Sequence, residues 1–248
     1  YKFTPSTSLN AAYGIYYQSP EYFWLSGDIL NKNLNSIRCE QYVLGIDHYF
    51  TGDLKASAEI YYKEYKDYPV WLDIPTYILI DGGSEFGPNI VGQAVSGGNG
   101  YTKGFDISLQ KKLSSGNGSG FYGLINYSYI NSGFTALAGN EKPGAFDPGN
   151  QFTVIAGYQF RDGWLAGAKF KYSGGRPYTP LNYEASAEVN RAVFATDDFN
   201  SSRYPYYMRV DLRVDKKFDF KNASLIAYIE LQNLFDRENI YSYYWNED

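Results

Sequence analysis

Cysteine, histidine and methionine each occur only once in the 248 residues of this chain. Cys39 can form no internal disulfide, and one cysteine with one histidine cannot supply the ligands of a protein zinc or other transition-metal site. We therefore expect neither a disulfide framework nor an all-protein metal centre, and no cofactor. We interpret Cys39 as a small structural residue.

Long apolar runs and an excess of positive charge are also missing. No stretch of about eighteen apolar residues occurs, which excludes membrane-spanning helices, and the mean hydropathy is -0.42. The 22 basic and 27 acidic residues give a net charge of -5, which argues against a nucleic-acid partner. A hydrophobic content of 44% nevertheless excludes wholesale disorder.

Aromatic residues are abundant, because they make up 19% of the sequence and include 27 tyrosines. A tyrosine combines an apolar ring with a hydroxyl that stays in water, which suits a membrane interface. Secreted binding proteins also use tyrosine, so the composition alone leaves both classes open.

Residues 164–172 alternate between two kinds of side chain, which is the period of a β-strand, and 54–62 repeat the layout. Lysines inside a soluble core would be costly, whereas a wall between lipid and water accommodates both faces. Such a strand covers roughly 26 Å, or roughly 20 Å of height when tilted by about 40°, close to the apolar band of about 25 Å of an outer-membrane barrel. The apolar face has Trp164, Ala166, Ala168, Phe170 and Tyr172, and the polar face has Leu165, Gly167, Lys169 and Lys171.

The same pattern predicts nine strands and a tenth candidate, with no convincing helix. Short connections alternate with mostly long ones, so the two kinds must lie at opposite ends, and aromatic residues gather near the strand ends. The expected fold is all-β: an antiparallel up-and-down transmembrane β-barrel. The predicted strands are 7–18, 37–50, 53–66, 101–113, 120–131, 150–160, 163–173, 206–218 and 223–234, with 239–245 as the tenth; the short connections are 51–53, 114–120, 161–163 and 219–222.

Two connections, 67–100 and 174–205, are too long to be simple turns, and long loops usually carry function or are disordered. Their aromatic side chains could contact a ligand or could pack the loops against each other, and the sequence favours neither. Four of their residues are our candidates for ligand binding. These are Trp71, Tyr77, Arg176 and Tyr178.

The chain lacks motifs for catalysis or phosphate binding. His48 lies three residues before the 51–53 connection, so we expect it far from the long loops and interpret it as a wall residue rather than a catalytic base. The glycine-rich segments 96–100 and 114–120 lack a following helix and the lysine of a phosphate loop, and they predict turns. We therefore do not expect an enzyme.

The C-terminal quarter resembles the last strands of TonB-dependent outer-membrane receptors. The resemblance is carried by RYPYYMRVDLRVDKKFDF (203–220) and ASLIAYIELQNLFDRENIYSYYW (223–245), and above all by the NLFD tetrad at 233–236. Weaker matches are AAYGIYYQSPE (11–21) and SGGRPYTP (173–180), in consistent order and spacing.

This resemblance covers nearly the whole chain. It implies that residues 1–248 form a single domain, the C-terminal part of a barrel of twenty-two strands in the outer membrane of a Gram-negative bacterium, with the plug domain and the final strand outside it. The implied partners are membrane lipid, the receptor's own plug and the TonB complex. The implied function is uptake of a scarce small molecule or metal chelate: a ferric siderophore, haem, cobalamin or a glycan.

Four charged residues alternate along one face of the predicted strand 206–218, roughly 6.7 Å apart. We expect a ladder of paired charges on the water side. In an intact receptor the ladder could hold the plug, or it could serve wall electrostatics alone. The four residues are Arg209, Asp211, Arg213 and Asp215.

Two other functions remain open. A complete small barrel acting as a pore or adhesin requires its first and last strands to pair. A secreted β-sandwich that binds carbohydrate requires mostly shorter strands and a dry apolar face, and lysines at alternate positions of long strands disfavour it.

Overall fold

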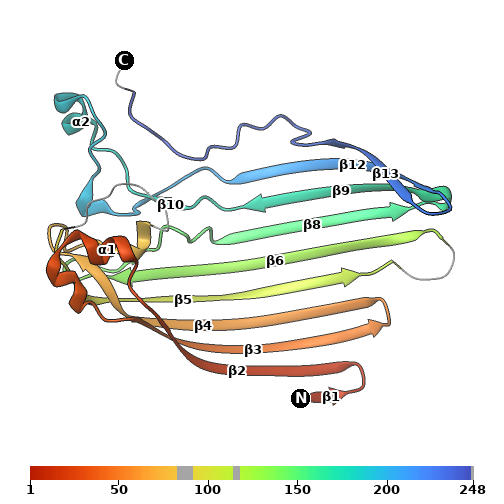
Figure 1. The fold of residues 1–248 in the computed structure, drawn as a ribbon, viewed down its shortest axis with the longest axis horizontal. Coiled ribbons are helices and arrows are strands. Elements are labelled where there is room, and N and C mark those ends of the chain that lie inside the picture. Colours follow the sequence, from red (N-terminus) through yellow and green to blue (C-terminus); the bar gives the residue numbers. More distant parts are fainter. Residues whose placement is uncertain (83–91, 114–117, 247–248) are drawn as a thin grey trace.

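The computed structural model describes residues 1–82, 92–113 and 118–246. Within them the chain forms one large antiparallel sheet in the order β1-β2-β3-β4-β5-β6-β8-β9-β12-β13, with β7 paired to β6 (Figure 1). This up-and-down order confirms the predicted all-β fold. The strands are β1 (Lys2–Thr4), β2 (Thr7–Gln18), β3 (Ile37–Thr51), β4 (Leu54–Trp71), β5 (Ala94–Lys111), β6 (Gly120–Thr135), β7 (Lys142–Pro143), β8 (Asn150–Gln159), β9 (Trp164–Ser173), β12 (Tyr207–Asp219) and β13 (Ser224–Leu231), and a separate two-stranded sheet pairs β10 (Pro177–Tyr178) with β11 (Ser202–Arg203).

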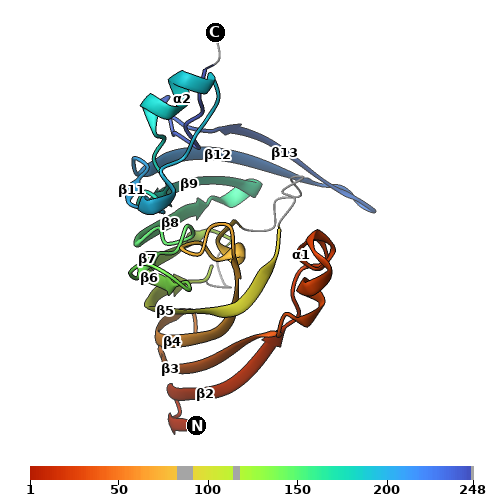
Figure 2. The same ribbon diagram turned by 90° about the vertical axis from the view of Figure 1, so that its left-hand side faces the viewer.

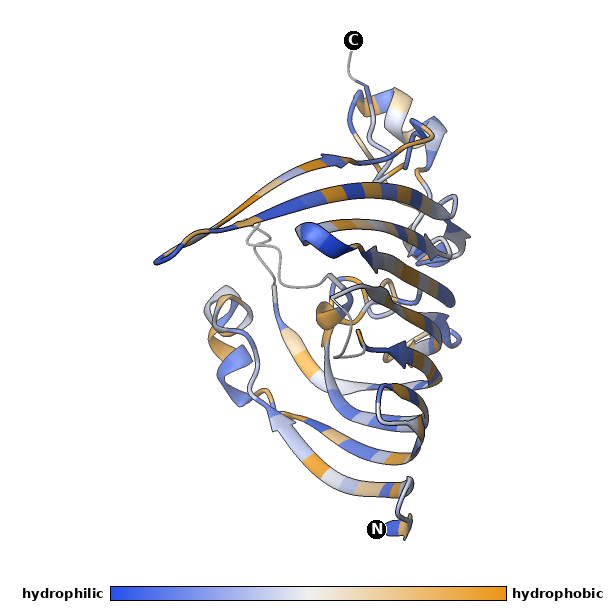
Figure 3. Ribbon diagram, turned by 90° about the vertical axis from the view of Figure 1, so that its right-hand side faces the viewer, coloured by the Kyte–Doolittle hydropathy of each residue, from blue (hydrophilic) through white to orange (hydrophobic). Residues whose placement is uncertain are grey.

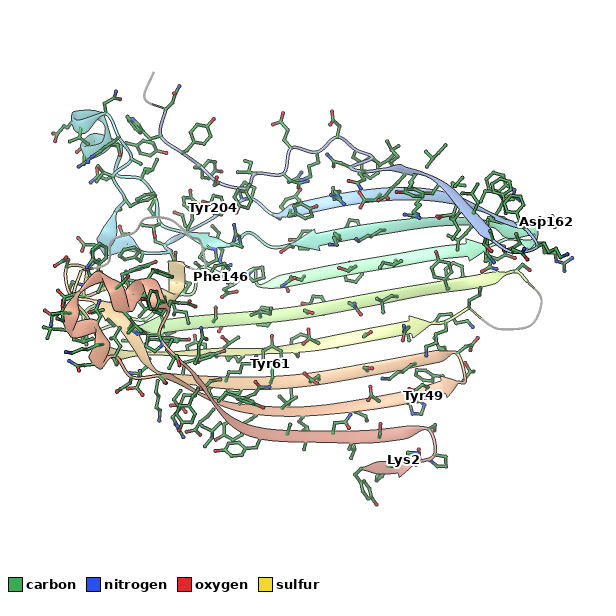
Figure 4. All side chains as sticks on the ribbon, viewed as in Figure 1. Lys2, Tyr49, Tyr61, Phe146, Asp162 and Tyr204 are labelled. Carbon is green, nitrogen blue, oxygen red and sulfur yellow. The ribbon has the colours of Figure 1, made fainter. Side chains whose placement is uncertain are left out.

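Short turns and long loops lie at opposite ends of the sheet, as predicted, and we call these the turn end and the loop end (Figure 1). Asp162 and Tyr49 mark the turn end, and Phe146 and Tyr204 mark the loop end (Figure 4). Residues 114–117 of one predicted turn lie outside the described residues. The sheet is curved, with β1 and β13 at its two edges (Figure 2).

The two faces of the sheet differ in chemistry, as the alternating colours along each strand show (Figure 3). Residues directly opposite in an antiparallel pair share a face, and Ala166, Ala168 and Phe170 lie opposite Val214, Leu212 and Val210. Lys169, by contrast, lies opposite Asp211. The predicted apolar and polar faces therefore continue from β9 into β12.

Tyrosine and glycine are paired across strands, which accounts for part of their abundance. Tyr61 lies opposite Gly104 and Tyr122 opposite Gly157. A Cβ on Gly104 would lie 2.2 Å from the Tyr129 carbonyl oxygen and 2.6 Å from the Tyr61 hydroxyl. Glycine is required at such positions because the neighbouring ring covers the backbone.

The glycine-rich segment 96–100, predicted as a turn, instead lies inside β5. A Cβ on Gly100 would come within 2.5 Å of the Tyr68 ring. Gly100 therefore makes room for a tyrosine ring, and Gly97 and Gly98 make room for neighbouring aliphatic side chains, within a strand that does not change direction. As a result β4 and β5 extend well beyond their predicted ends at the loop end.

The prediction that no helix occurs is wrong for the long loops. Asn182 accepts a hydrogen bond from the Ala185 N–H at 3.1 Å and so caps a short helix, which ends at Asn190 in a left-handed conformation. Helices this short show no long periodic pattern of apolar residues, so the sequence does not reveal them. They are α1 (Tyr22–Gly27) and α2 (Tyr183–Val189), with 3-10 turns η1 (Ile29–Asn33), η2 (Leu79–Gly82), η3 (Arg161–Gly163) and η4 (Thr196–Asp198).

None of the helices in the described ranges has the length and apolar character needed to cross a membrane. The tenth predicted strand is also wrong, because residues 239–245 form no strand. After β13 the chain turns at Asn233, where φ is 55°. Asn239 then bonds to both the N–H and the carbonyl of Met208, at 3.0 and 3.1 Å. The Asn239 side chain thus makes the hydrogen bonds to the β12 backbone that a paired strand would otherwise make.

Candidate functional site

A buried apolar cluster at the loop end anchors the long loops on the sheet. Asn31 ties it together: its side chain donates to the carbonyls of Trp24 and Gly92, at 2.8 and 3.1 Å, and accepts from the Ala94 N–H at 2.8 Å. This arrangement satisfies a fully buried amide. The cluster comprises Trp24, Ile37, Tyr68, Val70, Ile78, Leu79, Ala94 and Phe134.

Beside this cluster the loops line an open cavity of about 510 Å³, within the usual size range of small-molecule sites. All four residues predicted to bind ligand line it, although they come from two loops about a hundred residues apart. Phe146 and Tyr204 mark its position in Figure 4. The lining residues are Trp71, Ile74, Tyr77, Asp81, Gly82, Ala145, Phe146, Arg176, Pro177, Tyr178, Thr179, Phe194, Phe199, Asn200 and Tyr204.

Aromatic pairs hold the cavity walls together. Tyr77 stacks on Phe199 with ring centroids 4.8 Å apart, and Tyr178 stacks on Tyr204 at 4.3 Å. Tyr243 packs against both members of the second pair. The loop aromatics therefore do pack the loops against each other, and their contact with a ligand stays a prediction.

Asp81 connects two loops from the cavity wall. Its carboxylate accepts hydrogen bonds from the Asn200 amide at 2.6 Å and from the Ala145 N–H at 2.7 Å. Burial raises the pKa of Asp81, and these two donors offset part of that effect. Burial, with a smaller effect of the Asp81 charge, also raises the pKa of Tyr77, which keeps that hydroxyl protonated.

A second polar network fixes the antiparallel pair of β10 and β11, called the β10–β11 hairpin below although a long loop joins the two strands. Arg203 donates to the carbonyls of Asp147 and Gly175, at 2.7 and 3.0 Å, and its guanidinium lies 3.4 Å from the Asp147 carboxylate. Asp147 is 1% exposed and also accepts from the N–H groups of Ser132 and Gly149. Sequence reasoning missed this network and Asn200, because neither shows any motif or spacing.

Arg176 and Asp81 are the charged residues of the cavity lining. Arg176 is the only basic residue among the described residues that line it, and its guanidinium lies 5.6 Å from the Tyr241 ring centroid. Within the described part of the chain, no acceptor reaches the Trp71 indole N–H. The cavity thus combines flat aromatic faces with one cation, Arg176, and one carboxylate, Asp81.

Replacing Asn200 with alanine should loosen the cavity wall. The change removes bonds to the Asp81 carboxylate and to the Pro143 carbonyl and leaves a buried acid short of a donor, at a cost of about 1–3 kcal/mol. We expect faster amide hydrogen exchange in 72–82 and 142–149. Exposed Ser201, replaced with alanine, is the control; equal exchange in both variants would contradict the proposed coupling.

The charge ladder predicted on β12 is formed. Arg209 lies 2.8 Å from Asp211, and Arg213 lies 2.6 Å from Asp215. Arg213 also approaches Glu230 of β13 at 3.7 Å. The ladder lies on the polar face of the sheet, away from the cavity lining.

The single histidine and cysteine lie elsewhere. His48 shares a 2.8 Å hydrogen bond with the Thr7 hydroxyl near the turn end, and Cys39 lies opposite Tyr16 and Tyr65 on neighbouring strands. No group of three or more potential metal ligands occurs within 1–82, 92–113 and 118–246.

Solved outer-membrane proteins have the same fold. The ferripyoverdine receptor of the Pseudomonas aeruginosa outer membrane, bound to ferripyoverdine, matches with a TM-score of 0.65 at 17% identity, over 96% of this chain and 28% of that one. The FrpB iron transporter from Neisseria meningitidis matches at 0.65 and 13%, over 96% and 34%, and the YddB transporter from Escherichia coli at 0.63 and 13%, over 94% and 35%. This chain therefore spans between 28% and 35% of their lengths.

No curated protein matches the chain. The family model described as TonB dependent receptor-like, beta-barrel matches residues 1–234. That range holds every strand of the described sheet and the complete cavity lining. The chain belongs to this family of TonB-dependent receptor barrels.

Proposed function

We propose that the chain forms part of the barrel of a Gram-negative outer-membrane receptor that binds a scarce solute outside the cell and imports it. In this proposal the apolar face contacts lipid and the loop end faces outward. The main support is the loop-end cavity, where three loops bring aromatic faces and a single cation together, while the one acid, Asp81, is already bonded to Asn200 and Ala145.

The chemistry of the cavity favours an anionic solute with flat or ring-shaped parts. Stacked tyrosines can hold planar groups, and Arg176 can bond to a carboxylate or another anionic oxygen. A ferric siderophore or haem fits this combination better than a neutral glycan, which would use the aromatic faces alone. Two of the similar structures are a receptor bound to ferripyoverdine and an iron transporter.

The remainder of the transport machinery is also part of the proposal. A plug domain, supplied by the same receptor outside this chain, would lie against the polar face and contact the Arg209–Asp215 ladder. The TonB complex would then supply energy through that plug. A self-contained pore or adhesin is less well supported, because β1 and β13 occupy opposite edges of the described sheet and do not pair.

The test begins with uptake by cells that carry or lack the complete receptor. The panel consists of ferric hydroxamate and catecholate siderophores, haem, cobalamin and neutral oligosaccharides. We expect an anionic chelate to accumulate, and Arg176→Gln to weaken its binding about tenfold or more through loss of a charge-assisted hydrogen bond. Uptake of only neutral solutes would contradict the proposed substrate class.

Tyr178 and Tyr183 provide a matched pair of substitutions. Tyr178 lines the cavity, whereas Tyr183 lies in the same loop outside the cavity lining and is 71% exposed. Tyr178→Ala should reduce uptake of the accepted solute and Tyr183→Ala should not. Equal effects would indicate that the cavity is not the binding site.

A further inference from the structure

A second hollow lies at the turn end, far from the ligand cavity. It has a volume of about 500 Å³ and is formed where the β8–β9 turn meets β12. Its surface is mainly apolar, and the large side chains beside it remain exposed: Phe160 and Trp164 are each 47% exposed, and Val214 is 45% exposed. The lining residues are Phe160, Arg161, Asp162, Trp164, Leu165, Ala166 and Val214.

Three of these lining residues belong to the apolar face. Val214 lies directly opposite Ala166, and Lys216 lies directly opposite Trp164, so the hollow opens on the side that would contact lipid. Its place near the η3 turn sets it at the level of the membrane interface, where aromatic girdles occur. In a membrane, water would reach the rim of the hollow and acyl chains would reach its floor.

Lys216 is an unusual residue for this face; it does not line the hollow itself, but its side chain contacts two residues that do, Trp164 and Asp162. Its ammonium group lies 5.1 Å from the Trp164 ring centroid and 5.7 Å from that of Phe218, and it donates to the Asp162 carbonyl. A lysine ammonium has three donors, so this carbonyl uses only one. Arg161 adds a second cation at the turn.

We propose that this hollow binds one glycerophospholipid of the inner leaflet, with an acyl chain on the apolar floor and the phosphate between Lys216 and Arg161. Charge complementarity supports this occupant, because two cations outnumber the single acid, Asp162, at the rim. An anionic phosphate balances them, whereas an apolar partner alone would leave both cations unused. The site rests on the part of the proposed function that sets the apolar face against lipid and the loop end outward, and it is independent of the transported solute.

The test is native mass spectrometry of the complete receptor in detergent, with dioleoyl phosphatidylglycerol as the added lipid. The double variant Lys216→Gln and Arg161→Gln should retain this lipid more than about tenfold more weakly than the unmodified receptor. The control is Lys217→Gln with Lys221→Gln, which removes the same charge at the same end. Lys217 lies next to Lys216 but on the opposite face, paired with Asp219. Equal lipid retention in both double variants would overturn the proposal.

A second variant tests the acyl-chain part while keeping both cations. Ala166→Phe should fill the hollow and release the lipid, and heat-dependent migration on gels checks that the barrel is intact. Unchanged lipid retention in a folded Ala166→Phe receptor would overturn the proposal, as would displacement of the lipid by millimolar inorganic phosphate. Solute uptake should stay normal in the Lys216 and Arg161 double variant, which separates this site from the transport function.

Discussion

Replacing Gly175 with alanine is expected to reduce solute uptake about tenfold or more while the main sheet stays folded. A Cβ at this position would lie 1.5 Å from the Tyr204 carbonyl oxygen, which is backbone and cannot rotate away. Overpacking of this kind costs about 1–3 kcal/mol. The β10–β11 hairpin must therefore move, and it carries Arg176 and Tyr178 at the cavity wall.

Gly52→Ala is the control for this substitution, because a Cβ there meets no atom within 4 Å. Gly52 lies in the turn between β3 and β4, at the opposite end of the sheet. The measurement is uptake of the solute accepted by the unmodified receptor, with the barrel checked by heat-dependent migration. Normal uptake by Gly175→Ala would show that the hairpin position does not determine binding.

Replacing Ala168 with arginine is expected to impair assembly of the barrel. Ala168 is exposed near the middle of β9, on the face shared with Leu212. An arginine near the bilayer midplane costs about 2–4 kcal/mol. The receptor should consequently fold in lipid bilayers with a lower yield, measured as the heat-resistant fraction on gels.

Lys169→Ala is the matched control, because it changes the next residue on the opposite face. Lys169 lies opposite Asp211, so its loss removes one favourable charge and should have a mild effect. Equal folding of both variants in bilayers would contradict the assignment of the apolar face to lipid.

The sheet was predictable from sequence because its causes are local. Alternation along residues such as Trp164 to Tyr172 reports the two faces of one strand without reference to any other. The alternation of short and long connections then orders the strands, and nine of the ten predicted strands are present. Three of the four cavity candidates, Trp71, Tyr77 and Tyr178, could be predicted for a similar reason, because they are aromatic residues in long connections; Arg176 lies two positions before Tyr178.

The remaining features depend on contacts between distant residues. Gly100 gives no sign in sequence that the Tyr68 ring lies over it, so a turn was predicted where β5 continues. Asn200 and Asp81 are 119 positions apart and share a hydrogen bond that no spacing suggests. Residues 239–245 have strand-like composition, but Asn239 bonds to Met208 through its side chain instead of through a ladder.

The cross-strand tyrosine–glycine pairs bear on how the barrel wall finds its alignment during assembly. If β5 slipped by two residues against β4, Tyr61 would meet Thr102 or Asp106 in place of Gly104, since these share its face. A ring that fits over a bare backbone would then collide with a side chain. Alternation alone cannot reject such an even-numbered slip, because it returns every side chain to its own face. The tyrosine–glycine pairs disfavour such a slip, and they therefore select the observed alignment among those that the alternation of apolar and polar residues permits.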